Sequence, residues 1–206
     1  MKKIISIMLA SIVFVLALAS CTGGDPNNIA PEGMQLASDE NCAYYLYIPE
    51  NWALLDACSG GYVSYLDNEQ EFGLKTDIAN VTVSTFTAGD IKAEETGDTA
   101  ETTADETVAS ERIQYIDAFW AMCKESYARE LNGFTVVEEG KGTTLGLLDA
   151  KEYVYTANFD NTEYKMMMTV TYSGGVMYIV TYTAKTVRYD THMADVEKIL
   201  SEFKFK

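Results

Sequence analysis

The 206-residue chain has very little of what most active sites are built from. Its single histidine excludes metal sites made of several histidines and most acid–base machinery. It has no GxGxxG, P-loop or CxxC motif, so nothing in it points to dinucleotides, nucleotides or thiol redox chemistry. Basic residues are also scarce, with 15 Lys and Arg against 31 Asp and Glu. The net charge of −16 repels phosphate backbones and argues against a nucleic-acid partner.

Hydrophobic residues, in contrast, make up 48% of the chain and aromatic residues 12%, which is enough to bury the core of one ordinary domain. Tyrosine is abundant, with 14 copies, and proline is rare, with three. Because tyrosine favours extended strands, the composition indicates a domain rich in β-structure rather than a proline-rich linker protein.

The N-terminus has the pattern of a secretory signal. Lys2 and Lys3 precede an apolar run over residues 4–19 that ends in small residues. A simple membrane anchor is the alternative, but the run is shorter than the ~20 apolar residues that a spanning helix needs. Its end, Leu18-Ala19-Ser20-Cys21, resembles the bacterial lipoprotein box, in which a small residue precedes the cysteine.

The lipoprotein resemblance implies a fate for Cys21. In that family the thiol is joined to a diacylglycerol, the peptide is cut before the cysteine, and the new amine is often acylated. Two or three acyl chains anchor a protein stably. We therefore expect residues 1–20 to be a signal peptide and residues 21–41 to be the lipidated cysteine with a flexible tether. The protein would lie on the extracytoplasmic face of the cell membrane, with 13 basic and 31 acidic residues and a net charge of −18.

The predicted domain covers residues 42–206. Its first part holds strand patterns at 43–48 and 52–55, and then at 60–66 and 78–86. A turn centred on Glu50 would join the first two strands as a hairpin and place Cys42 opposite Cys58, within reach of a disulfide. Export permits oxidation. Two reduced thiols are an equal alternative, and the sequence leaves the choice open.

A change of pattern marks the middle of the chain. Residues 88–109 are acidic and lack aromatics, which predicts a disordered loop, either a solvated insertion or a site for cations or a partner. From Ser110 onward the apolar residues recur every three or four positions, which predicts a helix up to a stop at Asn132-Gly133. The residues of this apolar face are Ile113, Ile116, Trp120, Cys123, Tyr127 and Leu131.

The C-terminal part predicts a β-meander and a last helix. A weak strand over 134–141 precedes strong strands over 150–159, 162–172 and 176–184, and the helix covers 191–203. Two amphipathic helices and an antiparallel sheet indicate an α+β fold built in layers.

Turn residues predict the register of the three strong strands. A two-residue loop at Asp160-Asn161 places Tyr155 opposite Met166 and Tyr153 opposite Met168. A three-residue loop at Ser173-Gly174-Gly175 continues the register with four facing pairs. These are Tyr172 with Val176, Val170 with Tyr178, Met168 with Val180, and Met166 with Tyr182. One face would then carry Tyr, Met and Val across all three strands.

The order of elements resembles the PsbP-like fold. The resemblance rests on Ile48-Pro49-Glu50-Asn51-Trp52, on Asn80-Val81-Thr82-Val83, on the Trp-bearing helix, on the Tyr-rich meander with Tyr178–Ala184, and on Ser201-Glu202-Phe203-Lys204. That group includes photosystem II PsbP, a Ran-binding nuclear import factor, and bacterial lipoproteins similar to DcrB and LpqN. The resemblance implies an α/β/α sandwich, with an antiparallel sheet between helices, and an accessory docking role without a catalytic motif. The lipid anchor points to the DcrB/LpqN branch, and the acidic loop departs from the usual compactness.

Catalytic and metal-binding motifs are missing from the domain. A hydrolase triad would need His192, yet no serine lies in a G-x-S-x-G elbow. The acidic cluster Asp67-Asn68-Glu69-Gln70-Glu71 lacks the glycine and the final glutamate of an EF-hand loop. We therefore expect no catalytic residue, no metal site and no cofactor.

Three functional hypotheses remain. The leading one is a monomeric, non-catalytic lipoprotein that docks a protein or another envelope component. The first alternative is a small-molecule binder with a Tyr/Met-lined pocket between sheet and helix, which would need a volume of about 300 Å³ or more. The second is an unrecognised hydrolase that uses scattered carboxylates, which would need a titratable pair in a cleft.

Overall fold

The computed structural model of the chain describes residues 29–58, 61–66, 79–91 and 104–206. Residues 31–206 form one compact unit. In this unit a seven-stranded antiparallel sheet has the strand order β4-β5-β6-β10-β9-β8-β7. Its strands are β4 (Trp52–Cys58), β5 (Gly61–Leu66), β6 (Ala79–Thr87), β7 (Thr135–Leu145), β8 (Leu148–Phe159), β9 (Thr162–Ser173) and β10 (Val176–Lys185).

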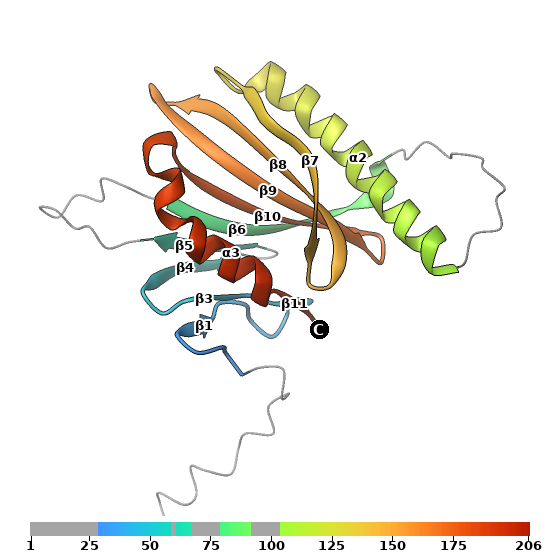
Figure 1. Cartoon of the computed structure of the whole chain (residues 1–206), viewed down its shortest axis with the longest axis horizontal. Coiled ribbons are helices and arrows are strands. Elements are labelled where there is room, and N and C mark those ends of the chain that lie inside the picture. The colour runs from blue at the N-terminus through green and yellow to red at the C-terminus, as the bar shows by residue number, and fades with distance from the viewer. Residues whose placement is uncertain (1–28, 59–60, 67–78, 92–103) are drawn as a thin grey trace, which may run out of the picture. The chain divides into compact units, whose positions relative to one another are not determined.

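Helices cover the two faces of this sheet. The long helix α2 (Ala104–Glu130) packs on β8 and β9 (Figure 1). Its buried residues Ile116, Phe119 and Trp120 join a cluster with the Tyr and Met side chains of β8 and β9. The second helix, α3 (Met193–Glu202), follows a 3₁₀ segment, η3 (Thr186–His192). The predicted α+β fold, an antiparallel sheet between helices, is confirmed.

The N- and C-terminal segments complete the layer on the α3 side. Strand β1 (Met34–Leu36) pairs with β3 (Tyr47–Pro49), and β2 (Tyr44–Tyr45) pairs with the C-terminal β11 (Lys204–Phe205). Aromatic rings join this layer to the sheet, because Tyr178 of β10 meets Tyr44 at 6.4 Å and Phe205 at 4.9 Å between ring centroids.

The predicted hairpin around Glu50 is wrong. Strand β3 pairs with β1, so Ile48 lies opposite Gln35, and β4 pairs with β5 in the large sheet. The chain crosses from one sheet to another at the turn, and therefore the register that placed Cys42 opposite Cys58 does not exist. The side chain of Cys58 lies outside the described residues, so the disulfide stays a prediction without that support.

The predicted flexible tether over 21–41 is also too long. Strand β1 lies inside it, and Met34, Ala37 and Ser38 are buried. The Ser38 hydroxyl accepts a hydrogen bond from the backbone N–H of Leu46, at 3.1 Å. The compact unit therefore begins about ten residues before the predicted boundary at 42.

The predicted acidic loop over 88–109 is only partly a loop. A short 3₁₀ turn, η2, covers Ala88–Asp90, and α2 begins at Ala104, six residues before the predicted start at Ser110. Ala88 and Ile91 belong to the core under α2. The central part of the predicted loop, residues 92–103, lies outside the described residues.

One of the two predicted hairpin registers is confirmed. Tyr155 lies opposite Met166 and Tyr153 opposite Met168, around a two-residue loop at Asp160-Asn161. Between β9 and β10 the prediction is wrong by one residue, because Ser173 pairs with Val176. Gly174 and Gly175 both have positive φ angles, 59° and 82°, so they form a two-residue loop by themselves. The facing pairs are therefore Tyr172 with Met177, Val170 with Ile179, Met168 with Thr181, and Met166 with Thr183.

Candidate functional site

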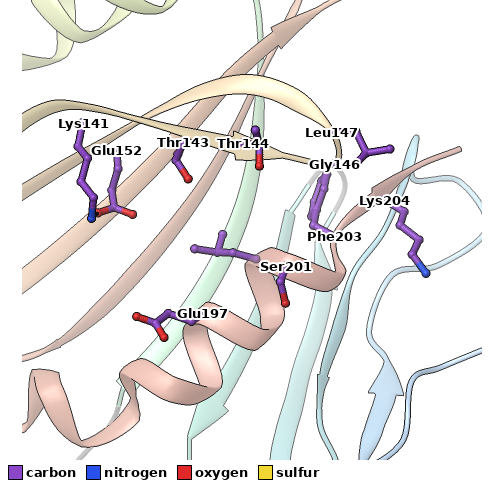
Figure 2. A pocket seen from close by; sticks show the side chains of 11 residues that line it. Lys141, Thr143, Thr144, Gly146, Leu147, Glu152, Glu197, Ser201, Phe203 and Lys204 are labelled. Atoms are coloured by element: carbon purple, nitrogen blue, oxygen red, sulfur yellow. Dashed lines mark hydrogen bonds and ion pairs between the residues drawn. The ribbon is translucent and has the colours of Figure 1, made fainter.

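A cavity of about 510 Å³ opens between the β7–β8 hairpin and α3 (Figure 2). Its walls come from two parts of the chain that are about 50 residues apart in sequence, and the C-terminal residues close one end. The lining residues are Lys141, Thr143, Thr144, Gly146, Leu147, Glu152, Glu197, Leu200, Ser201, Phe203 and Lys204.

The sheet wall is built by two neighbouring strands. Lys141 of β7 lies opposite Glu152 of β8, and the Lys141 Nζ donates a hydrogen bond to Glu152 Oε1 at 3.3 Å. Thr143 lies opposite Ala150, two residues from Glu152, so it shares this face of the sheet. The Glu152 side chain is only 13% exposed, whereas that of Lys141 is 57% exposed. The wall therefore presents a mostly buried carboxylate, whose lysine partner is more exposed to water.

The helix wall is a stripe along α3. Glu197, Leu200 and Ser201 are spaced three and four residues apart, which places them on one side of the helix. A different stripe of α3, containing Val196 and Ile199, is buried in the core. Figure 2 shows Glu197 and Ser201 across the cavity from Lys141, Glu152 and Thr143.

The hairpin tip forms the rim. Gly146 and Leu147 both have positive φ angles, 57° and 71°, and the Leu147 side chain is 98% exposed. A Cβ atom on Gly146 would lie 2.7 Å from Phe205 Cδ2 and 3.3 Å from Phe203 Cδ1. The glycine therefore lets the tip rest on the C-terminal aromatics. A branched residue at positive φ is strained, and such strain is concentrated at functional sites.

The charges around Lys141 are mainly negative. The hydrogen bond to Glu152 raises the pKa of Lys141, and the charges of Glu152, Glu138 and Glu197 raise it further. Lys204 lines the far end, but its side chain points away from the other charged groups in Figure 2. Its Nζ lies 4.0 Å from Glu202 Oε2 and 5.7 Å from the centroid of the Tyr47 ring.

A buried hydroxyl adjoins this cavity wall in the sheet. Thr169 of β9 lies opposite Glu152, on the same face, and is 1% exposed. Its Oγ1 has no hydrogen-bond partner among the described residues. Buried polar groups without partners are rare and call for an explanation.

The predicted Tyr/Met-lined pocket is not the cavity that we describe. Tyr153, Tyr155, Met166 and Met168 are core residues packed under α2. The cavity lies on the α3 side, and neither Tyr nor Met is part of its lining. The register shift in β10 does not change this assignment, because β8 and β9 alone carry these four side chains.

The other residues singled out in the sequence lie elsewhere. His192 ends η3 at the start of α3 and does not line the cavity. Cys123 is buried in the core under α2, and burial raises the pKa of its thiol to about 11. Cys21 and the acidic cluster 67–71 lie outside the described residues. Within the described ranges, no group of three or more His, Cys, Asp or Glu residues could hold a metal ion. No helix in the described part of the chain is long and apolar enough to cross a membrane.

Sequence reasoning missed this site. Lys141, Glu152 and Glu197 belong to no motif, and only the folded chain brings them together. The second stripe of the last helix, Glu197 with Leu200 and Ser201, is the one local signal, and it resembles an ordinary solvent-facing edge.

No family model matches the chain, and no curated protein does. Among solved structures, LpqN of Mycobacterium tuberculosis, described as involved in cell envelope biogenesis, is 16% identical, with a TM-score of 0.48 over 79% of this chain and 83% of LpqN. Cyanobacterial PsbP from Synechocystis is 17% identical, with a TM-score of 0.48 over 92% of this chain and 99% of its own. The Ran-binding protein Mog1p of Saccharomyces cerevisiae is 8% identical, with a TM-score of 0.48 over 84% of this chain and 95% of Mog1p. LpqN and PsbP are among the proteins that the sequence resemblance named.

Proposed function

We propose that this chain is a membrane-anchored, extracytoplasmic module that binds a ligand or partner and does not catalyse a reaction. The observation that carries the proposal is the cavity between the β7–β8 hairpin and α3. Its volume of about 510 Å³ is above the ~300 Å³ at which pockets begin to hold ligands. This supports a binding site for a small molecule or for one side chain of a larger partner.

The chemistry of the lining supports binding over catalysis. Lys141 is paired with Glu152, Lys204 lies near Glu202, and the remaining polar side chains are hydroxyls and the carboxylate of Glu197. Cys123, a potential nucleophile, lies on the opposite face of the sheet, under α2. A hydrolase would need a nucleophile or an acid–base pair directed at one point of the cavity.

Docking of a larger partner is supported by the rim. Leu147 is 98% exposed beside the cavity, at a backbone conformation that a leucine rarely adopts. An exposed apolar side chain on a tight hairpin tip can insert into a partner, as anchor residues at interfaces do. The proposed module is a monomer that the Cys21 lipid holds at the membrane.

Crosslinking on intact cells tests this proposal. A photoreactive amino acid is placed at Leu147, and a matched control at Val187, which is 88% exposed but does not line the cavity. We expect a specific adduct from position 147 and none from position 187. Identical adduct patterns from the two positions, or turnover of an ester, glycoside or peptide substrate that one carboxylate substitution abolishes, would contradict the proposal.

A further inference from the structure

We propose that the cavity between the β7–β8 hairpin and α3 takes up a primary ammonium group carried on a short aliphatic chain. This inference rests on the proposed function, because it names the class of ligand for the same cavity.

The lining holds two lysines and two glutamates, and one of the two lysines points away from the other charges. Lys141 is the one cation of the lining that points toward the carboxylates of Glu152 and Glu197 in Figure 2. Lys204 does not offset this balance, because its Nζ is held near Glu202 and the Tyr47 ring. One cation of the lining therefore faces two carboxylates.

Acceptor atoms are left over after the internal contacts are made. Glu152 has its one ion pair through Oε1, at 3.3 Å, although its side chain is only 13% exposed. Glu197 has no hydrogen bond or ion pair with any described residue and is exposed on the cavity side of α3. An ammonium group donates three hydrogen bonds and would use such acceptors.

The lining also contains an apolar part. Leu200 of α3 and Phe203, which follows that helix, are apolar lining residues. Lysine-like groups bury their methylene stems along apolar surface while the charged end meets its partners. A cation with an aliphatic stem fits this wall better than a bare inorganic ion, which agrees with the absence of a metal-binding cluster among the described residues.

Three probes of matched size test the inference. The full-length chain in detergent micelles is titrated with butylamine, butyrate or butanol at constant ionic strength, and backbone amide shifts are followed by NMR. We expect saturable shifts at Lys141, Thr143, Glu197 and Leu200 with butylamine, and at least about tenfold weaker binding of butyrate and butanol.

Two variants move the affinity in opposite directions. Glu197→Gln removes a carboxylate and is expected to weaken butylamine binding about fivefold. Lys141→Met frees Glu152 and removes a like charge, so it is expected to strengthen binding by a similar factor. Glu125→Gln makes the same charge change on α2, outside the cavity lining, and is expected to leave binding unchanged.

Several results would overturn the inference. These are tighter binding of butyrate, the opposite response of the two variants, equal effects of Glu197→Gln and Glu125→Gln, or no cavity shifts with any probe. In each case a specific crosslink from position 147 would leave the proposed binding function standing. If butylamine binds but that crosslink is absent, the proposed binding function in the cell is contradicted. The proposed ligand class is then still supported.

A free polyamine and a lysine side chain of a partner protein share this chemistry. The same titration with spermidine and with Nα-acetyl-lysine amide separates the two sources. Tighter binding of spermidine assigns a free polyamine, and tighter binding of the lysine amide assigns a protein side chain. Failure of both to shift the cavity residues would contradict the inference.

Discussion

At the scale of single residues, Gly146 decides how the β7–β8 tip sits on the C-terminal aromatics. Its φ angle is 57°, and an added Cβ would lie 2.7 Å and 2.9 Å from two ring carbons of Phe205. We expect Gly146→Ala to lower the free energy of unfolding by about 1–3 kcal/mol, through strain and displaced rings. Urea denaturation measures this.

Gly142 of β7, four residues before Gly146, is the matched control. It has nothing within 4 Å of a built Cβ and no positive φ. Gly142→Ala is expected to change stability by no more than about 0.5 kcal/mol. Equal losses in the two variants would show that contact with the aromatics does not position the tip.

Buried tyrosines under α2 predict loss of stability at alkaline pH. Burial raises the pKa of Tyr153 and Tyr155 well above the ordinary value, and the charge of Asp117 raises that of Tyr153 further. A pKa that is higher in the folded than in the unfolded state contributes stability that is complete below the unfolded value of about 10. That stability is lost as the pH rises beyond it.

We therefore expect cooperative unfolding above pH ~10, with these two rings ionising only as the chain unfolds. NMR of the tyrosine ring carbons follows each ring, and Tyr155→Phe should raise the pH at which unfolding begins. Ionisation of Tyr153 and Tyr155 while the sheet stays intact would contradict this explanation.

At the scale of elements, α2 is held on the sheet by its apolar face, by a hydrogen bond and by an ion pair. Trp120 stacks on Tyr153 with 4.3 Å between centroids and donates a hydrogen bond from Nε1 to Glu139 Oε1 at 2.7 Å. Lys151 Nζ lies 2.6 Å from Asp117 Oδ1. Exposed ion pairs contribute little, so the apolar face supplies most of the stabilisation.

Ile116→Ala tests this view of α2, because Ile116 is 0% exposed. We expect a loss of about 2–5 kcal/mol in the free energy of unfolding, since the truncation leaves a cavity. Met122→Ala on the same helix, where the residue is 42% exposed, should cost less than about 1 kcal/mol. Chemical denaturation compares the two, and similar losses would show that α2 is not packed through this face.

Local sequence patterns predicted where the strands and helices lie better than they predicted which strands pair and in which register. The Asp160-Asn161 turn was sufficient to predict the β8–β9 register. The register of β10 was missed because both Gly174 and Gly175 adopt positive φ, which shortens the loop by one residue. The segments around Glu50 look like a hairpin, yet β3 pairs with residues 34–36, which carry no strong strand pattern of their own.

The candidate site could not be predicted because its parts are distant in sequence. The pairing of Lys141 with Glu152 depends on two irregularities in the β7–β8 register, between Val136 and Glu138 and between Glu138 and Lys141. Neither is visible as a motif. The position of Glu197 opposite them depends on how α3 packs, through Val196 and Ile199 on its other stripe.

At the scale of the whole molecule, the N-terminal lipid is the prediction that places the domain at a membrane. Cys21→Ser removes the thiol that would form the thioether, so we expect loss of acyl labelling and an uncleaved or mislocalised precursor. Metabolic labelling with a fatty-acid analogue measures this. Cys42→Ser is the control cysteine and should label like the wild type. Equal labelling of Cys21→Ser and wild type would contradict the lipid anchor.

We propose that this domain works by binding in the cavity between the β7–β8 hairpin and α3. The most direct test is crosslinking on intact cells from position 147 in three backgrounds. They are the wild type, Ser201→Trp, which fills the cavity from α3, and Ser110→Trp, which places the same side chain on α2. We predict a specific adduct in the wild type and in Ser110→Trp that disappears in Ser201→Trp. An adduct that persists unchanged in Ser201→Trp would contradict the claim.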